Sequence, residues 1–215
     1  MEDGTGLSTM PPSRRLVLVR HGESQANADG LFTGRLDPPL TENGRREACA
    51  VGTTLRNEGH RFEAAFTSTM TRAVTTMSLA LGALGQAELV PRQDAALDER
   101  DYGDLGGLDK ATSHKRFGAE QVEDWRRSYE GRPPNGESLR DTVARVLPFH
   151  LRHIQPATMR GPTLVVGHGN ALRAMVMALE GLGPGEVECL ELATGSIRIY
   201  EFAPDTTIAS RRIIG

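Results

Sequence analysis

The stretch that decides the fold is Leu16-Val17-Leu18-Val19-Arg20-His21-Gly22-Glu23-Ser24-Gln25-Ala26-Asn27. Its four consecutive apolar residues are typical of a strand buried on both faces. The strand then ends at the cationic pair Arg20-His21, which Gly22 follows. Ligands of open α/β sheets bind at the carboxyl ends of the strands, so an imidazole beside a guanidinium at this position predicts phosphate chemistry. An ordinary strand end with a solvated histidine would give the same pattern.

A second stretch repeats this design near the C-terminus. Thr163 to Gly167 is an apolar strand pattern, and His168, Gly169 and Asn170 then open a helical pattern. A helix N-terminus offers free backbone N–H groups and a positive dipole, which suit an anion. Two strand-end histidines in one α/β chain therefore favour a functional interpretation of both stretches.

Composition sets the class of protein. The chain has 215 residues, of which 38% are hydrophobic, and this fits one globular domain. We expect residues 1–13, rich in glycine and proline, to be a loose tail and residues 14–215 to form the domain. The formal net charge of -3 argues against a nucleic-acid-binding protein. The two cysteines are far apart, and there is neither a signal-peptide pattern nor an apolar run long enough to cross a membrane, so we expect a cytoplasmic protein.

Between the two histidine stretches, helical and strand patterns alternate, as expected of an α/β protein. The expected elements are a helix over 41–58, a strand over 62–67, a helix up to residue 84, a strand over 88–90, a helical segment over 111–129 and a helix from 138 that Pro148 kinks.

Several polar residues in the connections are candidates for binding an anion. Arg72 follows the 62–67 strand as Arg20 follows the first strand, so we expect the two arginines at neighbouring strand ends, as a fork-shaped phosphate clamp. Thr33, Gly34 and Arg35 lie in a turn-rich loop and could reach the same phosphate, although turn chemistry alone also explains them.

The glycine-rich loop over 97–108 carries Glu99, the candidate proton donor. Apolar packing and a nearby phosphate dianion would raise the pKa of this carboxyl, as a general acid near neutral pH requires. A solvated acidic loop is the alternative. Arg126 and Arg127 are adjacent, so both can serve one ligand only near a helix end.

Two chemistries fit a pair of histidines with arginines. In the first, His21 attacks phosphorus, His168 and the arginines stabilise the charge, and Glu99 handles the proton of the leaving group. In the second, the histidines and a carboxylate bind a metal ion. Arg20 would repel a divalent cation, and the sequence has no supporting ligand spacing, which favours the first chemistry and no metal.

The sequence resembles the histidine phosphatase superfamily through Leu18-Val19-Arg20-His21-Gly22-Glu23-Ser24-Gln25-Ala26-Asn27. Within that superfamily it is similar to the 2,3-bisphosphoglycerate-dependent phosphoglycerate mutases. That similarity rests on Phe32-Thr33-Gly34, Asp98-Glu99-Arg100-Asp101-Tyr102-Gly103, Trp125-Arg126-Arg127-Ser128-Tyr129 and Gly167-His168-Gly169-Asn170, and it runs from about residue 15 to the end.

The resemblance implies a three-layer α/β/α sandwich with a mostly parallel sheet. It implies interconversion of 3- and 2-phosphoglycerate through a phosphohistidine, with 2,3-bisphosphoglycerate as primer and intermediate. The implied catalytic residues are His21, Glu99, His168, Arg20 and Arg72. The implied substrate-binding residues are Arg20, His21, Gly22, Glu23, Ser24, Asn27, Thr33, Gly34, Arg72, Glu99, Arg100, Tyr102, Lys110, Arg126, Arg127, Gly169 and Asn170.

The chain also departs from the family pattern. Many members have a tryptophan where Arg35 stands, a longer loop after Arg127 and a longer C-terminal tail over the pocket. A more open pocket lets water reach a phosphohistidine, so a histidine phosphatase acting on another phosphorylated metabolite is the alternative function. A third hypothesis is a binding module without catalysis, against which His21, Glu99 and His168 argue. Relatives are often homodimers or homotetramers, and no interface is marked in this sequence.

Overall fold

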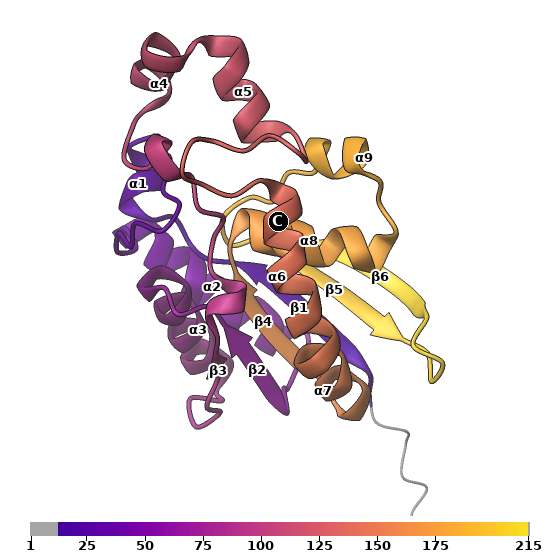
Figure 1. The fold of residues 1–215 in the computed structure, drawn as a ribbon. Helices are drawn as coiled ribbons and strands as arrows, with labels where there is room; N and C mark the ends of the chain where they lie inside the picture. The colour runs from indigo at the N-terminus through magenta and orange to yellow at the C-terminus, as the bar shows by residue number, and fades with distance from the viewer. Residues whose placement is uncertain (1–12, 215) are drawn as a thin grey trace, which may run out of the picture.

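The strands are β1 (Arg15–Arg20), β2 (Ala64–Thr67), β3 (Arg92–Gln93), β4 (Thr163–Gly167), β5 (Ile197–Phe202) and β6 (Ile208–Ile214). The computed structural model describes residues 13–214, so the predicted tail lies outside the described residues except for Ser13. Within them, the strands form one sheet in the order β3-β2-β4-β1-β5-β6 (Figure 1). The pairs from β3 to β1 are parallel, whereas β5 is antiparallel to both of its neighbours. The expectation of a mostly parallel sheet is confirmed.

The helices are α1 (Gln25–Ala28), α2 (Glu42–Asn57), α3 (Thr71–Leu84), α4 (Lys110–Phe117), α5 (Ala119–Arg127), α6 (Leu139–Phe149), α7 (Gln155–Arg160), α8 (Gly169–Glu180) and α9 (Pro184–Cys189). Helix α2 begins after Thr41, whose hydroxyl accepts from the Gly44 N–H at 3.0 Å. Helix α6 contains Pro148 and passes into a π-helical turn over His150–Ile154 before α7. Proline cannot donate to the helical ladder, which accounts for a change of hydrogen-bond pattern here, and the kink expected at Pro148 stays a prediction.

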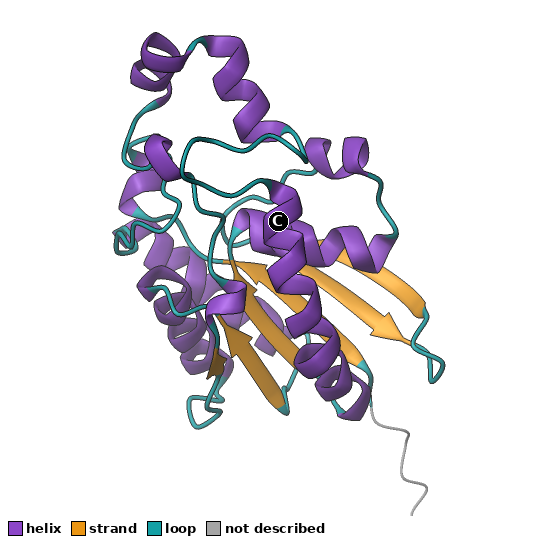
Figure 2. Cartoon of the chain, viewed as in Figure 1, coloured by secondary structure: helices purple, strands orange, loops and turns teal. Residues whose placement is uncertain are grey.

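Helices cover both faces of the sheet and give three layers (Figure 2). On one face, α2 and α3 pack through Val51, Leu55 and Met77 against the side chains of Val17 and Val19. On the other face, α6, α7 and α8 pack against the alternate side chains of β1, including Leu16 and Leu18. Both faces of β1 and β4 are buried, and this explains why their sequences are continuous apolar runs rather than alternating ones.

Helices α4 and α5 lie at the carboxyl edge of the sheet, apart from the three layers (Figure 1). They are attached through a small apolar cluster of Phe32, Leu105 and Val122. The prediction of one helical segment over 111–129 is wrong in one respect, because Gly118 breaks it. This residue has φ 89°, a conformation that favours glycine and ends a helix.

Two further expectations differ from the structure. The strand predicted over 88–90 is wrong: Val90 is 85% exposed, and the short β3 follows Pro91 instead. The C-terminal β5, β6 and α9 are not among the expected elements, although the alternation Ile197-Arg198-Ile199 is typical of a strand. Within residues 13–214, no helix is both long enough and apolar enough to cross a membrane.

The contact between α2 and α3 makes a stability prediction. A Cβ added at Gly52 would lie 2.1 Å from the Ala80 carbonyl oxygen, whereas one added at Gly82 would meet nothing within 4 Å. We expect Gly52→Ala to lower the free energy of unfolding by about 1–3 kcal/mol, since the helices must move apart. Gly82→Ala, in the exposed interior of α3, should raise it by about 0.5–1 kcal/mol. Urea titrations of both variants check this, and equal effects would contradict the packing described here.

Candidate active site

The carboxyl ends of β1, β4 and β2 lie side by side and bring three polar residues into one row. Arg20 pairs with Gly167, so His21 and His168 follow at equivalent positions; Val166 pairs with Thr67, so Ser68 lies opposite Gly167, one position before His168. The two imidazole rings have centroids 4.9 Å apart at an angle of 62°. Both are buried, with 3% of His21 and none of His168 exposed. The register of the parallel sheet therefore sets the distance between the histidines.

The hydrogen bonds of His21 fix which ring nitrogen carries the proton. Nδ1 lies 2.7 Å from the carbonyl oxygen of Gly22. A carbonyl only accepts, so Nδ1 must donate, and in the neutral ring Nε2 then keeps its lone pair. The ring is thus held in the tautomer that an Nε2 nucleophile requires.

His168 is oriented by Ser68. Its Nε2 lies 2.7 Å from Ser68 Oγ, which also accepts the Met70 N–H at 3.2 Å. Among the described residues the Ser68 proton has no other acceptor, so it goes to His168 Nε2. The proton of the neutral His168 ring is then on Nδ1, a buried atom with no partner within residues 13–214. This places a spare donor beside His21.

Both histidines are held neutral. Burial lowers the pKa of His21 well below 6.5, and the charges of His168, Arg72 and Arg20 lower it further. Burial and the charges of Arg72, Arg20 and Arg145 likewise hold the pKa of His168 well below 6.5. A cation beside other cations in a buried site is disfavoured, so a proton is not retained. At neutral pH the Nε2 lone pair of His21 is therefore available.

Two arginines face this pair of rings. Arg72 donates to the carbonyls of Leu36 at 2.8 Å and Gly34 at 3.3 Å, and Arg20 donates to the carbonyl of Leu192. The Nε atoms of both arginines are buried without a partner in the described chain. A buried unpaired donor is costly, so these N–H groups are suited to an anion that arrives later.

The arginines are not on neighbouring strands as expected. β4 lies between β1 and β2, so His168 stands between the strand ends that carry Arg20 and Arg72. Sequence order could not reveal this, because β4 comes from the far end of the chain and inserts between the two earlier strands. The clamp consequently encloses a histidine as well as the phosphate position.

Glu99 is 9% exposed and its Oε1 accepts two backbone N–H groups, from Arg100 at 2.8 Å and from Asn170 at 3.1 Å. Burial opposes ionisation, but the Arg100 N–H and the charges of Arg72 and Arg20 outweigh it and lower the pKa of Glu99. This lowered pKa belongs to the carboxyl with no phosphate beside it, so the rise expected next to a phosphate dianion stays a prediction.

Two adjoining cavities open at this site. The first, which we call the His21 chamber, has a volume of about 260 Å³ and the second, the Arg127 chamber, about 480 Å³. They share Arg20, Glu99, Tyr102 and Arg126. The predicted residues that line the first chamber are Arg20, His21, Asn27, Thr33, Arg72, Glu99, Tyr102, Lys110 and Arg126. Those that line the second also include Arg127, Gly169 and Asn170.

The remaining predicted substrate-binding residues lie behind this lining. Glu23 accepts from the Thr41 hydroxyl at 2.6 Å, and Ser24 caps α1. A Cβ on Gly22 would meet the carbonyl of Gly44, and one on Gly34 would meet the backbone of Tyr102. The fully buried Arg100 lies 4.5 Å from the centre of the Tyr102 ring. Gly22, Glu23, Ser24, Gly34 and Arg100 thus shape the site rather than line either chamber.

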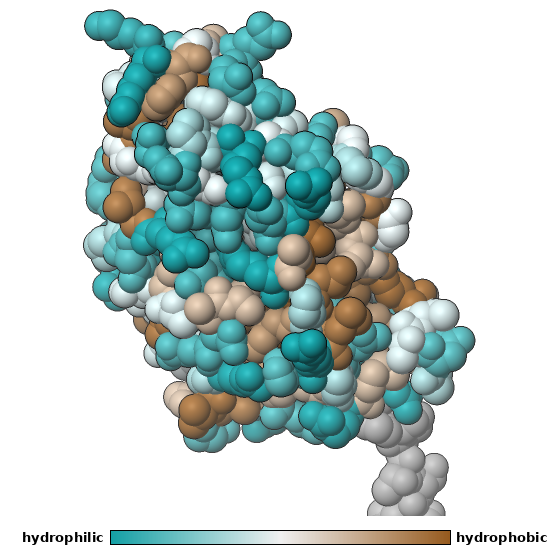
Figure 3. All heavy atoms as spheres, viewed as in Figure 1, coloured by the Kyte–Doolittle hydropathy of each residue, from teal (hydrophilic) through white to brown (hydrophobic). Residues whose placement is uncertain are grey.

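Two lining or adjacent residues were missed by sequence reasoning. Arg173 lines the Arg127 chamber and donates to the Leu190 carbonyl at 2.7 Å. It follows Asn170 by three positions on α8, a helical spacing that could have identified it. Glu123 pairs with Lys110 at 2.8 Å and with Arg126 at 3.3 Å, which no local pattern indicates. Hydrophilic side chains also cover the upper part of the face drawn in Figure 3, where α4 and α5 lie.

The sequence profile of the histidine phosphatase superfamily (branch 1) matches residues 16–213. The chain belongs to this superfamily. A 2,3-bisphosphoglycerate-dependent phosphoglycerate mutase of Bartonella bacilliformis is 53% identical over 202 residues, which are 94% of this chain and 98% of that protein. A protein of the same name from Mesorhizobium japonicum is 51% identical over 203 residues, again 94% and 98% of the two chains.

Solved structures of the superfamily share the fold at lower identity. A mycobacterial glucosyl-3-phosphoglycerate phosphatase in complex with VO3 has a TM-score of 0.78 and 27% identity, covering 94% of this chain and 98% of that chain. An α-ribazole phosphatase from Shigella flexneri has a TM-score of 0.78 and 26% identity, covering 90% and 93%. Both sets of similar proteins, the curated relatives and the solved structures, thus agree with membership in the histidine phosphatase superfamily.

The neutral state of this histidine phosphatase site can be measured by titration. We expect neither His21 nor His168 to take up a proton between about pH 7.5 and about pH 6, because their pKa values lie well below 6.5. The unfolded chain binds these protons first, so the corresponding contribution to stability is full above about pH 6.5 and declines as the pH falls. Imidazole NMR shifts report both rings.

A variant that removes one positive charge tests the cause of the lowered histidine pKa values. Arg20→Gln should raise the pKa of both histidines, whereas Arg140→Gln, an exposed arginine paired with Glu130, should leave both unchanged. A midpoint near 6.5 for either ring in the unaltered protein would contradict the electrostatics described here.

Proposed function

We propose that the protein interconverts 3-phosphoglycerate and 2-phosphoglycerate through a phosphohistidine on His21, as a 2,3-bisphosphoglycerate-dependent phosphoglycerate mutase. The observation that carries this is the state of His21: buried, neutral, and held through Nδ1 by the Gly22 carbonyl with Nε2 free. The names of relatives that are more than 50% identical over nearly the whole chain support the reaction.

The site supplies the charge that phosphoryl transfer needs. As Nε2 of His21 forms a bond to phosphorus, the Nε–H groups of Arg20 and Arg72 and the Nδ1–H of His168 are donors for the equatorial oxygens. All three are buried donors without partners in the described chain, so a phosphoryl group fits them. 2,3-Bisphosphoglycerate, when bound, supplies the phosphoryl group that primes His21.

Glu99 moves the proton. In the ligand-free protein its carboxyl is ionised, as the lowered pKa requires, so it accepts the proton of the substrate hydroxyl that attacks the phosphohistidine. The bond between phosphorus and Nε2 breaks as the bond to that oxygen forms. In the second transfer His21 takes the other phosphoryl group of the bisphosphate, and Glu99 returns the proton to the leaving oxygen. One carboxyl thus serves both halves of the cycle.

Lys110, Arg126 and Arg127 bind the remaining negative charge of the substrate. Lys110 and Arg126 line the His21 chamber, and Arg127 lines the Arg127 chamber together with the amide of Asn170. Arginine binds carboxylates and phosphates through paired N–H groups. We assign the substrate carboxylate to this group and the second phosphoryl position to the space between the chambers.

A histidine phosphatase acting on another phosphorylated metabolite is the second candidate. It is favoured by the named phosphatases among similar structures and by the adjoining Arg127 chamber, which offers room for water or a bulkier ester. We further propose a cytoplasmic protein without nucleic-acid or membrane partners. A homodimer or homotetramer stays a prediction.

The first experiment follows 3-phosphoglycerate by phosphorus NMR, with and without catalytic 2,3-bisphosphoglycerate. We expect 2-phosphoglycerate to accumulate rapidly only when the bisphosphate is present, because His21 must be primed. Orthophosphate as the main product would replace the mutase proposal by the phosphatase.

Substitutions then assign the roles. His21→Asn should lower kcat by about a millionfold, as loss of a nucleophile does. Glu99→Gln should lower it by about 10² to 10⁴, the usual contribution of general acid–base catalysis. His153→Gln, which removes a histidine whose contact with Arg92 is exposed, is the matched control and should be neutral. Full turnover by His21→Asn would refute the phosphohistidine mechanism.

A further inference from the structure

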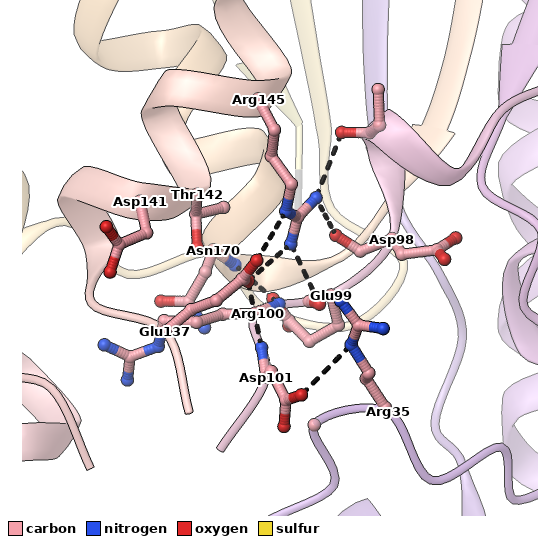
Figure 4. Close-up of polar contacts among 12 residues, drawn as sticks. Arg35, Asp98, Glu99, Arg100, Asp101, Glu137, Asp141, Thr142, Arg145 and Asn170 are labelled. Atoms are coloured by element: carbon pink, nitrogen blue, oxygen red, sulfur yellow. Dashed lines mark hydrogen bonds and ion pairs between the residues drawn. The ribbon is translucent and has the colours of Figure 1, made fainter. Parts of the chain in front are cut away.

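Arg145 of α6 binds the backbone of the loop that carries Glu99 (Figure 4). Its NH1 donates to the carbonyl oxygens of Ala96 at 3.0 Å and Asp98 at 2.8 Å, and its NH2 donates to that of Glu99 at 3.0 Å. Three carbonyls within four residues of the loop thus converge on one guanidinium. None of these three bonds depends on the identity of a loop side chain.

Glu137, just before α6, completes the contact. Its carboxylate accepts Nε of Arg145 at 3.1 Å and NH2 at 2.9 Å, a paired geometry. The same carboxylate accepts the Asp101 N–H at 3.1 Å, and the Glu137 N–H donates to the Asp101 carbonyl at 2.8 Å. Arg145 and Glu137 therefore hold both ends of the segment over 96–101, with Glu99 between them.

The electrostatics of the pair favour its charged form. Burial opposes ionisation of Glu137, but the hydrogen bond and charge of Arg145 outweigh it and lower the pKa of that carboxyl. The two side chains are 23% and 19% exposed, so solvent competes little for their hydrogen bonds. Lysine could not reproduce the contact, because it has no planar fork of donors.

The loop needs such a support. Residues 98–102 lie outside the helices and strands; the Asp98 carboxylate accepts the Thr69 N–H at 2.9 Å, and the carboxylate of Glu99 accepts the N–H groups of Arg100 and Asn170. A shift of the loop backbone would move Oε1 away from the Asn170 N–H and from the His21 chamber. Another contact, between Arg35 and Asp101 at 3.0 Å, comes from an arginine whose side chain is 69% exposed, and such a pair contributes little.

We propose that Arg145 is a positioning residue for proton transfer: it acts through the loop backbone to keep the Glu99 carboxyl at the reacting oxygen. Arg145 lines neither chamber, so it does not touch the substrate. The proposal rests on the proposed function, because it assumes that Glu99 handles the proton. We expect substitution of Arg145 to lower the rate of proton transfer, as substitution of Glu99 does, rather than to weaken substrate binding.

The test compares two phosphoryl donors that differ in their need for a proton. Phosphorylation of His21 by an alkyl phosphate such as 2,3-bisphosphoglycerate requires Glu99 in its protonated form, which gives its proton to the leaving oxygen, whereas 4-nitrophenyl phosphate releases a stable phenolate without help. We expect Arg145→Gln to slow phosphorylation of His21 by the bisphosphate about a hundredfold, the scale of a misplacement of about 1 Å, with little change in KM. Transfer from 4-nitrophenyl phosphate should change only a few fold.

A double variant identifies the route of the effect. If Arg145 acts through Glu99, then Glu99→Gln combined with Arg145→Gln should be no slower than Glu99→Gln alone. Arg140→Gln, on the same helix and with an exposed partner, is the matched control and should match the unaltered protein with both donors. Multiplicative effects in the double variant, or equal losses with both donors, would overturn the proposal.

Two further measurements keep the outcome decisive. Thermal unfolding shows whether Arg145→Gln is folded; if it is not, Arg145→Lys replaces it, and the same discrimination between donors is expected since lysine lacks the fork. The protein without substitutions distinguishes a failure of the proposed function from a failure of the positioning role of Arg145. If neither donor phosphorylates its His21, the proposed function fails, whereas a phosphorylated enzyme with an insensitive Arg145 variant refutes the positioning role alone.

Discussion

The parallel pairing of β1 with β4 is the constraint on which the site depends. These strands are buried on both faces, and their register leaves no freedom to slide without moving apolar side chains out of the core. Because Arg20 stands opposite Gly167, the next residue of each strand is a histidine, and the rings meet at 4.9 Å. The hydrophobic core thus fixes the geometry of groups that are themselves polar.

That geometry concentrates positive charge in a buried place and leaves it partly unsatisfied. Neutral histidines lower the cost, and the carboxylate of Glu99 offsets the charges of Arg20 and Arg72. The unpartnered Nε atoms of these arginines remain. The unpaired donors lower the stability of the fold locally. They are already in place for a phosphoryl group, so they need not reorganise when it binds.

The sequence predicted what depends on local pattern. The buried strands, the helix that begins after Thr41 and the histidines after their strands all follow from short-range periodicity and capping chemistry. What it could not predict depends on strand order and long-range contacts. The insertion of β4 separates Arg20 from Arg72, the charges of these two arginines lower the pKa of Glu99, and Arg145 reaches its three carbonyls across nearly fifty residues of chain. The site residues assigned by resemblance stay predictions.

We expect the two ends of the proposed site to bind anions with different strength, and this suits the proposed mutase cycle. Arg72 is buried and its Nε lacks a partner, whereas Lys110 is 56% exposed and, like Arg126, already paired with Glu123. An anion meeting the exposed cations must compete with a carboxylate and with water, so it gains less than one meeting the buried donors. The bisphosphate has to turn between the two transfers, and strong binding at both ends would oppose that turn. A firm inner clamp with a weaker outer one fixes the phosphoryl group for chemistry while leaving the rest of the molecule free to exchange ends.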